Sequence, residues 1–500
     1  MKKNEITSAN IGEMGRKIIA TMLTLALSGP AWASDWKLGA SVTASETYTD
    51  NVTLGATGGS KGDFVTSITP TITAKKDGAR LKVDASYSNQ NLFYAEDSTR
   101  NTTYHQLNAH ANAELFENEI FLDTTASISQ ASISPLAATG VDNTNATGNL
   151  TSVRSVTVSP YWIHRFGSTA TLNARYAISE VGNSSDAFSG STNYSTNLSL
   201  ASGSAFGRVS WGLNYSEQTV DYSDRSDVSF TTTSASLGYL ISSRLRLTGT
   251  VGTSKNSYVS STGAATGGSF WNIAGSWAPS TRTSLDLGFG HQYYGKSWNM
   301  AFKTRGVNSV WTADYSESVT TSNSQTGQSA SFGAGQIVSL TSSNNLLSNQ
   351  VFLSKRFATA FSWKKRKHDF SLGAYRSIQT TEIDSTVNTN VNLQIGNIGF
   401  SNSTNDVFLS TSEVKQVGVN ASWKWQWTAL TNTNLSTSLT RSDFPSLNRQ
   451  DTVSSLQFGL DRKFSPQLSG SVSLRRQMRD SNQNAHFTEN ALTGSVTYTF

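Results

Sequence analysis

Apolar and polar residues alternate in short stretches along most of the chain. The first stretch places Trp36, Leu38, Ala40, Val42 and Ala44 at every second position. The same period recurs in the segments Leu81–Tyr87, Leu107–Leu115, Leu122–Ile128, Val156–Trp162, Ala170–Tyr176, Val209–Tyr215, Leu285–Phe289, Val417–Trp423, Leu456–Leu460 and Leu468–Leu474. A period of two is typical of a β-strand with one apolar and one polar face. Helical spacing is not sustained over any long segment, so the pattern predicts an all-β protein.

The connections between these stretches are of two kinds. Short turns fall near residues 76–78, 116–119, 164–168, 201–207, 242–244, 279–282, 364–367 and 465–467. Longer polar segments fall near residues 49–62, 130–149, 256–268, 320–348 and 382–412. Bacterial outer-membrane barrels pair short periplasmic turns with longer external loops and have an even number of strands. We therefore predict a single transmembrane antiparallel β-barrel of about 22 strands, within a range of roughly 20–24 because the hairpin near residues 305–308 is the least clear.

The N-terminal segment has the features of a secretory leader. Its basic residues are Lys2, Lys3, Arg16 and Lys17. An apolar run over residues 18–27 follows, and Ala31 and Ala33 then place small side chains where signal peptidase requires them. The run is shorter than the stretch of about 20 residues that a membrane-spanning helix needs. We predict a signal peptide cleaved before Ser34, with Met14 as an alternative start.

The C-terminal segment alternates in the same way and ends on an aromatic residue. Leu492, Val496, Tyr498 and Phe500 occupy alternate positions of this stretch. A terminal aromatic residue preceded by alternating apolar residues resembles the signal that the barrel-assembly machinery reads. The predicted organisation is thus a signal peptide over residues 1–33 and one outer-membrane β-barrel over residues 34–500.

Composition agrees with one large barrel. Charged residues make up 15% of the chain, there are 7 Pro, and there is no Cys. The net charge is +5, of which the leader supplies +2 with four basic and two acidic residues, so the remainder carries only +3. This net charge is too weak to argue for a nucleic-acid-binding protein, which would need clustered basic residues on one face, so we expect no nucleic-acid partner. Nine tryptophans lie near the short turns, where an aromatic girdle meets the membrane interface: Trp36, Trp162, Trp211, Trp277, Trp311, Trp363, Trp423, Trp425 and Trp427.

The candidates for catalysis or metal binding are few. Among the six histidines, we expect His110 alone to point into the lumen, beside Asn108 and Asn112, and interpret it as a lining residue. No pair of histidines has the spacing of a metal site on one face. We predict no catalytic, cofactor-binding or metal-binding residues. The basic cluster Lys364–His368 is interpreted as a solvated periplasmic turn, with contact to anionic lipid or an acidic polymer as the alternative.

The inward-facing charges are mixed in sign. They are Lys82, Asp84, Asp123, Asp286, Lys424, Asp461 and Arg475. A ring of one sign, which narrow ion selectivity requires, is not visible among them.

Several segments resemble a known family. They are Tyr48–Val52, Phe93–Asp97, Tyr104–Ala109, Asn145–Asn149 followed by Ser159–Trp162, Trp211–Ser216 and Trp311–Thr321. Together they resemble the outer-membrane proteins associated with PEP-CTERM/exosortase systems, over nearly the whole mature chain. The resemblance implies an outer-membrane β-barrel in bacteria that make exopolysaccharide, with a role in its export or in biofilm matrix assembly. It implies no catalytic residues.

A barrel of this size encloses a lumen too wide for side chains alone to fill. The first strand begins close to the cleavage site, so we expect no N-terminal plug. The lumen is then an aqueous pore, or long loops such as residues 320–348 and 382–412 fold into it. We expect a pore or export conduit for a hydrophilic polymer. The alternatives are a non-conducting docking protein for matrix assembly and, less favoured, an outer-membrane enzyme. The expected partners are outer-membrane lipid, the barrel-assembly machinery and exopolysaccharide or its export proteins.

Overall fold

The computed structural model describes residues 36–56, 59–184, 188–223, 226–258, 260, 265–329, 348, 350–382, 411–483 and 485–500. The predicted leader, with Ala31, Ala33 and Ser34, lies outside these residues. So does most of the segment 382–412.

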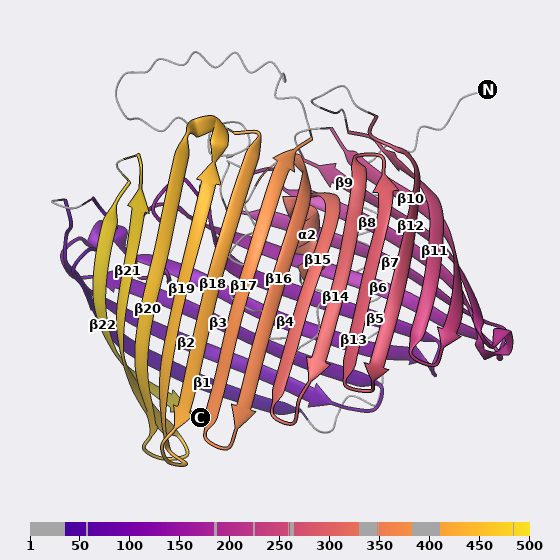
Figure 1. Ribbon diagram of the computed structural model, residues 1–500. Helices are drawn as coiled ribbons and strands as arrows, with labels where there is room; N and C mark the ends of the chain where they lie inside the picture. The colour runs from indigo at the N-terminus through magenta and orange to yellow at the C-terminus, as the bar shows by residue number, and fades with distance from the viewer. Residues whose placement is uncertain are drawn as a thin grey trace, which may run out of the picture.

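Within the described residues, 22 strands form one antiparallel sheet that closes on itself (Figure 1). The strands of the first half are β1 (Lys37–Thr49), β2 (Asp63–Asp77), β3 (Leu81–Tyr94), β4 (Thr102–Phe116), β5 (Ile120–Ser132), β6 (Leu150–Phe166), β7 (Ala170–Asn183), β8 (Ser191–Ser202), β9 (Val209–Tyr222), β10 (Val228–Ser242) and β11 (Leu245–Asn256). Those of the second half are β12 (Gly268–Ser280), β13 (Thr283–Gln292), β14 (Gly295–Arg305), β15 (Ser309–Thr321), β16 (Val351–Lys365), β17 (His368–Thr381), β18 (Glu413–Gln426), β19 (Thr431–Phe444), β20 (Arg449–Lys463), β21 (Leu468–Ser481) and β22 (Phe487–Thr499). Helical segments are α2 (Ser322–Ser329) and the short 3-10 helices η2 (Ser98–Arg100), η3 (Ser204–Phe206) and η5 (Pro445–Leu447).

The first and last strands pair with each other and close the barrel. Their register runs from Ser41 opposite Thr499 to Thr49 opposite Ala491. A closed barrel leaves no strand edge unpaired, which is what the hydrocarbon core of a membrane demands of a sheet. The prediction of about 22 antiparallel strands is confirmed, and the hairpin near residues 305–308 joins β14 to β15.

The two ends of the barrel differ as predicted. The short turns lie at the lower end in Figure 1, which is the periplasmic end by the usual orientation of such barrels. Tight reversal there is helped by left-handed backbone at Asn118 (φ 58°) and Gly167 (φ 56°). Not every external connection is long, however, because only Tyr293 and Tyr294 separate β13 from β14.

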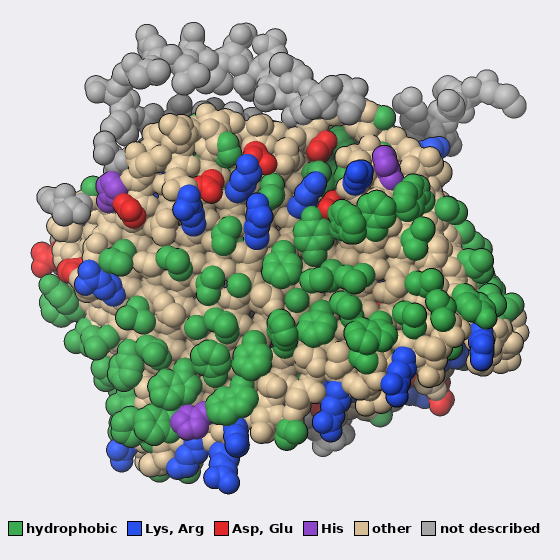
Figure 2. Space-filling model, viewed as in Figure 1, with side chains coloured by type: hydrophobic (Ala, Val, Ile, Leu, Met, Phe, Trp, Pro, Cys, Tyr) green, Lys and Arg blue, Asp and Glu red, His purple; other side chains and the backbone are tan. Residues whose placement is uncertain are grey.

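The outer surface is apolar in a broad band (Figure 2). Side chains at the alternating positions project away from the lumen, as Leu237 (64% exposed) and Ile273 (59% exposed) illustrate. In water, so much exposed apolar surface would be unfavourable, whereas lipid tails are a good solvent for it. The protein is therefore an integral protein of the outer membrane, and this band faces the lipid.

The tryptophans near the short turns border this band. Six of them are exposed on the outer surface within a few residues of a strand end: Trp36, Trp162, Trp277, Trp311, Trp423 and Trp427. Trp423 and Trp425 stack with their ring centroids 5.9 Å apart. Amphipathic indole rings at this level are typical of the membrane interface. Trp271 and Trp298 lie near the external ends of β12 and β14, where the opposite interface is expected.

Candidate functional site

The loop between β5 and β6 crosses the inside of the barrel. We call this segment, residues 133–149, the inner loop. Its Leu136 packs against Phe352, Val414 and Phe444, three buried residues on β16, β18 and β19. Those strands lie about half the circumference away from β5 and β6. The inner loop therefore spans the external half of the lumen from one wall to the other.

A buried carboxylate on β22 forms the first anchor of the inner loop. Glu489 is fully buried and accepts hydrogen bonds from Arg475 Nη2 (2.7 Å), Gln477 Nε2 (2.8 Å) and Thr49 Oγ1 (2.8 Å). The inner loop adds a fourth donor, because Asn145 Nδ2 lies 3.0 Å from Glu489 Oε1. A buried charge is tolerated only when it is paired and its hydrogen-bonding capacity is filled. The loop thus completes the shell of this carboxylate.

Two further contacts strengthen the first anchor. Arg475 forms an ion pair with Asp142 of the inner loop in addition to its pair with Glu489. Gln477 donates to Asn145 Oδ1 (3.0 Å) and accepts from the backbone N–H of Val141 (3.1 Å). Both Arg475 and Gln477 project inward from β21, and both are buried. The contacts on this wall are consequently charged and directional.

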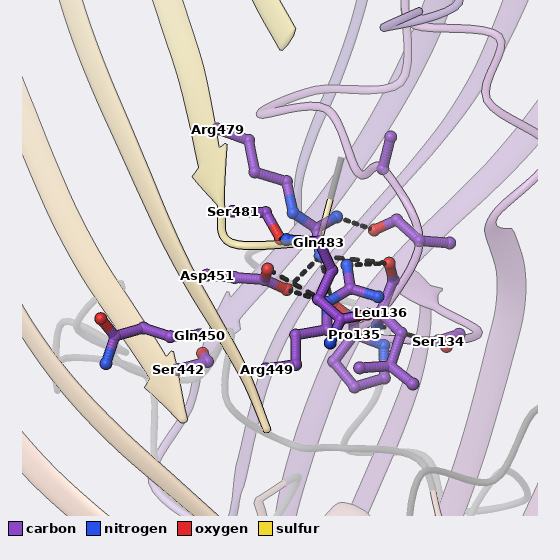
Figure 3. A network of polar contacts seen from close by, with 12 residues as sticks. Ser134, Pro135, Leu136, Ser442, Arg449, Gln450, Asp451, Arg479, Ser481 and Gln483 are labelled. Atoms are coloured by element: carbon purple, nitrogen blue, oxygen red, sulfur yellow. Dashed lines mark hydrogen bonds and ion pairs between the residues drawn. The ribbon is translucent and has the colours of Figure 1, made fainter. Parts of the chain in front are cut away.

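The second anchor binds the turn at residues 135–137 of the inner loop (Figure 3). Arg479 Nη2 donates to the carbonyl oxygens of Pro135 (3.0 Å) and Leu136 (3.1 Å). Arg449 Nη2 also donates to the carbonyl of Leu136 (2.7 Å). Asp451 lies between the two guanidinium groups and forms an ion pair with each. Because the Asp451 carboxylate compensates their like charges, both arginines can donate to the same loop carbonyl, that of Leu136.

A second segment enters the lumen from the opposite wall. The helix α2 follows β15 and reaches the inner faces of β8 and β9. Asn323 Nδ2 donates to the carbonyl of Ser189 (3.1 Å) and to Ser191 Oγ (2.9 Å), and Gln218 Nε2 donates to Ser324 Oγ (2.7 Å). The start of the predicted long loop 320–348 therefore folds into the lumen. An inward-folded loop was one of the two alternatives that the sequence left open, the other being an open aqueous pore. The inner loop is the insertion that sequence reasoning did not name.

The lumen wall on the periplasmic side of these insertions is rich in hydroxyl groups. Neighbouring strands present paired side chains, with oxygen atoms 2.8 Å apart in Thr43–Thr497 and 2.7 Å apart in Ser471–Ser495. Ser371–Ser422 (2.6 Å) and Ser438–Ser455 (2.7 Å) repeat the arrangement on other strands. Each hydroxyl can both donate and accept, so such a wall can exchange hydrogen bonds with a polar solute without holding a charge.

His110 points into the lumen, as predicted, and belongs to a small polar cluster. Its Nε2 lies 2.9 Å from Asp123 Oδ1, and Arg175 Nη1 lies 3.6 Å from Asp123 Oδ2. Arg175 also donates to Ser159 Oγ (3.0 Å) and stacks over the ring of Tyr161. Among the described residues, no serine or threonine hydroxyl is hydrogen-bonded to the His110 ring. The geometry is that of a lining residue whose ring is hydrogen-bonded to Asp123.

The described part of the chain has neither a cluster of metal ligands nor a membrane-crossing helix. No group of three or more His, Cys, Asp or Glu side chains there is placed to hold a metal ion. No helix in those ranges is both long enough and apolar enough to cross a membrane.

The predicted assembly-signal residues all lie on one face of β22. Leu492, Val496 and Tyr498 are exposed on the lipid-facing surface, and Phe500 follows the strand with 73% of its surface exposed. The structure thus presents them outward in one row, and their recognition by the assembly machinery stays a prediction. Of the anchor residues, sequence reasoning identified only Arg475 as inward-facing. Gln477 and Arg479 occupy the next two alternate positions of β21, so the alternation that placed Arg475 inward could have identified them as well.

Comparison with known proteins finds no matching protein-family model and no matching curated protein. Among solved structures, the chain is similar to the siderophore receptor PirA of Pseudomonas aeruginosa, with 10% identity, 93% of this chain and 80% of that one covered, and a TM-score of 0.43. It is also similar to OccK2 (OpdF) of the same organism, with 11% identity, 93% and 98% covered, and a TM-score of 0.35. A third similar structure is the FrpB iron transporter of Neisseria meningitidis, with 10% identity and a TM-score of 0.41. The match covers 93% of this chain and 83% of that one. The description of this chain as an outer-membrane barrel rests on its own strands and its own lipid-facing surface.

Proposed function

We propose that the protein is a conduit for a hydrophilic solute across the outer membrane, and that the inner loop and α2 set the width of the passage. The observation that carries the proposal is the contrast between the two faces of each strand, since the outer face is apolar and the inner face is lined by paired hydroxyl groups. A wide polar interior is the usual property of barrels that pass solutes.

The proposed cargo is a polymer of an exopolysaccharide system. This part rests on the sequence resemblance to PEP-CTERM/exosortase-associated barrels and on the chemistry of the wall. Sugar hydroxyls can replace water in the hydrogen bonds of serine and threonine side chains, so a chain of sugars can advance without one tight binding step. No catalytic step forms part of the proposal.

A second candidate is a non-conducting docking protein for matrix assembly. It is favoured by one specific observation, namely that the inner loop and α2 enter the lumen from opposite walls and are both hydrogen-bonded to the wall that they reach. If these insertions close the passage, the external loops remain as the functional surface.

Single-channel recording in planar bilayers separates the two candidates. A conduit should give discrete current steps for the purified protein, and dextrans of increasing size should report the width of the passage. A variant lacking residues 135–147 should conduct more than the wild type if the inner loop narrows an open lumen. Absence of current in the wild type together with current in the deletion variant would support the docking role. Absence of current in both proteins, with barrel folding verified by altered gel migration on boiling, would contradict the conduit.

A further inference from the structure

The periplasmic rim of the barrel carries an uneven distribution of charge. On one side of the rim, from the turn before β9 to the end of β18, the turns and the adjoining four residues of each strand contain eleven Lys and Arg. They contain only two acidic residues, Asp286 and Asp369, which leaves a net charge of +9. We call these eleven cations the basic arc. Figure 2 shows basic side chains along the lower rim, beneath the apolar band.

The corresponding parts of β1 to β5 do not share this charge. There, five basic residues are set against six acidic ones, for a net charge of −1. Three of these cations are paired directly, Lys75 with Asp84 (3.5 Å), Arg80 with Glu117 (3.7 Å) and Lys82 with Asp77 (3.9 Å). The rim therefore has a basic side and a nearly neutral side. The net charge of the whole chain does not show this difference.

The strand positions of the basic arc face the lumen rather than the lipid. The inward-facing members are Arg246, Lys303, Arg305, Lys364 and Lys424. The members on turns are Arg208, Arg244, Arg282, Arg366 and Lys367. Only Lys365 occupies a lipid-facing strand position, and the other lipid-facing positions at this level include Trp211, Trp277, Trp311 and Trp423. This division argues against a site for lipid headgroups, which would require cations on the outer surface.

The inward-facing cations are available for a ligand. Lys303, Arg305 and Lys424 are exposed, and none of them has an ion pair or side-chain hydrogen bond with another described residue. Arg246 donates to Ser210 Oγ (3.4 Å), and the exposed Lys364 pairs with the half-exposed Asp369 (3.6 Å). Cations that line an opening raise the local concentration of anions there, and low-dielectric walls strengthen the effect.

We propose that the basic arc is the entry site for an anionic polysaccharide, a chain whose sugar units carry carboxylate groups, on the periplasmic side of the lumen. This inference rests on the proposed conduit and specifies the charge of its cargo. A flexible, hydrated chain can reach the cations that point into the opening as well as those on the turns. A folded protein partner would contact the turns alone, so the inward-facing half of the arc favours the polysaccharide.

The test measures binding and conduction separately. Binding of oligogalacturonate to the full-length mature protein in detergent is followed by calorimetry, with uncharged dextran of similar length and a poly-glutamate peptide for comparison. The arc variant replaces the five inward-facing cations by glutamine (R246Q, K303Q, R305Q, K364Q, K424Q). The matched control replaces three inward-facing cations outside the arc (K37Q, K75Q, K82Q). Conduction is followed by reversal potentials in a salt gradient.

Oligogalacturonate should bind the wild type, more weakly as salt is raised, and dextran should not bind detectably. An exposed ion pair contributes about twofold in affinity, so the arc variant should bind roughly thirtyfold more weakly while the control stays within about twofold. Unchanged affinity in the arc variant, or no binding to the wild type, would overturn the proposal. Preferential binding of poly-glutamate would overturn it in favour of an acidic protein partner.

The two proposals can fail independently. If the protein conducts current but binds oligogalacturonate independently of the arc, the proposal of an anionic cargo is wrong and the proposed conduit is retained. If binding depends on the arc but the protein conducts no current, the proposed conduit is wrong and the rim is an anion-binding site without transport. If both proposals hold, the wild type should prefer anions over cations, and the arc variant should lose most of that preference.

Discussion

Removing the Arg475 side chain should release the inner loop from the wall of β21 and β22. The substitution Arg475→Ala deletes both bonds to Glu489 (2.7 and 3.2 Å), the ion pair to Asp142 and the contact to Thr144 (3.4 Å). It leaves Glu489, which is fully buried, without its cationic partner. Breaking one side of a buried ion pair costs about 3–5 kcal/mol. Because the barrel has its own hydrogen-bonded strands, we expect that cost to fall on docking of the loop.

A change of this size lowers the ratio of docked to released loop by about two to four orders of magnitude, less whatever the second anchor recovers. The chain has no cysteine, so a single spin label can be attached at Val141→Cys without other replacements. Val141 lies in the inner loop, and 48% of its surface is exposed, so the label should be tolerated. In the wild type the spectrum should show an immobilised label, and in Arg475→Ala a mobile one. The label reports docking whether or not the protein conducts.

The neighbouring arginine provides the matched control. Arg476 lies on the other face of β21, and its side chain donates a hydrogen bond to the exposed Asn490 (3.4 Å). Arg476→Ala should therefore leave the label immobilised. Arg475→Lys keeps the charge but loses the two-pronged contact with Glu489, and we expect an intermediate spectrum. If Arg475→Ala kept an immobilised label in a correctly folded barrel, the assignment of Arg475 as an anchor would be wrong.

Three further predictions concern packing, lipid contact and assembly. Leu136→Ala should mobilise the same label, because a leucine truncated in an apolar cluster loses about 2 kcal/mol or more; an unchanged spectrum would show that the anchors alone hold the loop. Leu474→Arg, on the lipid-facing side of β21, should destabilise the barrel in vesicles by about 2–4 kcal/mol, whereas Ser473→Arg, one position away and facing the lumen, should cost far less; equal losses in denaturant titrations would contradict the assigned faces. Deletion of Phe500 should slow folding into vesicles that contain the barrel-assembly machinery but not into vesicles without it, and equal rates in the first case would refute the assembly signal.

The barrel was predictable from sequence because its pattern is local. The alternation of apolar and polar residues within a strand, as in Leu468–Leu474, shows which side chains face the lipid and which face the lumen. The lengths of the connections then distinguish the periplasmic end of the barrel from the external end. The indole positions at the periplasmic interface follow from the same parity. No knowledge of distant contacts was needed for any of these features.

The arrangement inside the lumen was not predictable in this way. Parity showed that Arg475 faces inward, but its partner Asp142 is 333 residues away in the chain. The inner loop was one of several long polar segments, and nothing in its own sequence distinguished it from residues 320–348. Its insertion depends on Leu136 fitting between Phe352, Val414 and Phe444, which is a property of the closed barrel. The charge asymmetry of the rim was also hidden, because strands that are neighbours in space bring together residues that are far apart in sequence.

The position of Glu489 has a consequence for the order of biogenesis. Its shell combines Thr49 from the first strand, Gln477 from the penultimate strand and Asn145 from the inner loop, so it exists only when the earliest and latest parts of the polypeptide have met. A chain that is still being inserted lacks this carboxylate, so the first anchor of the inner loop forms only when the final strand arrives. Truncation before β22 would accordingly produce an open sheet with a loose loop, a form prone to aggregation and proteolysis, and not a smaller working channel.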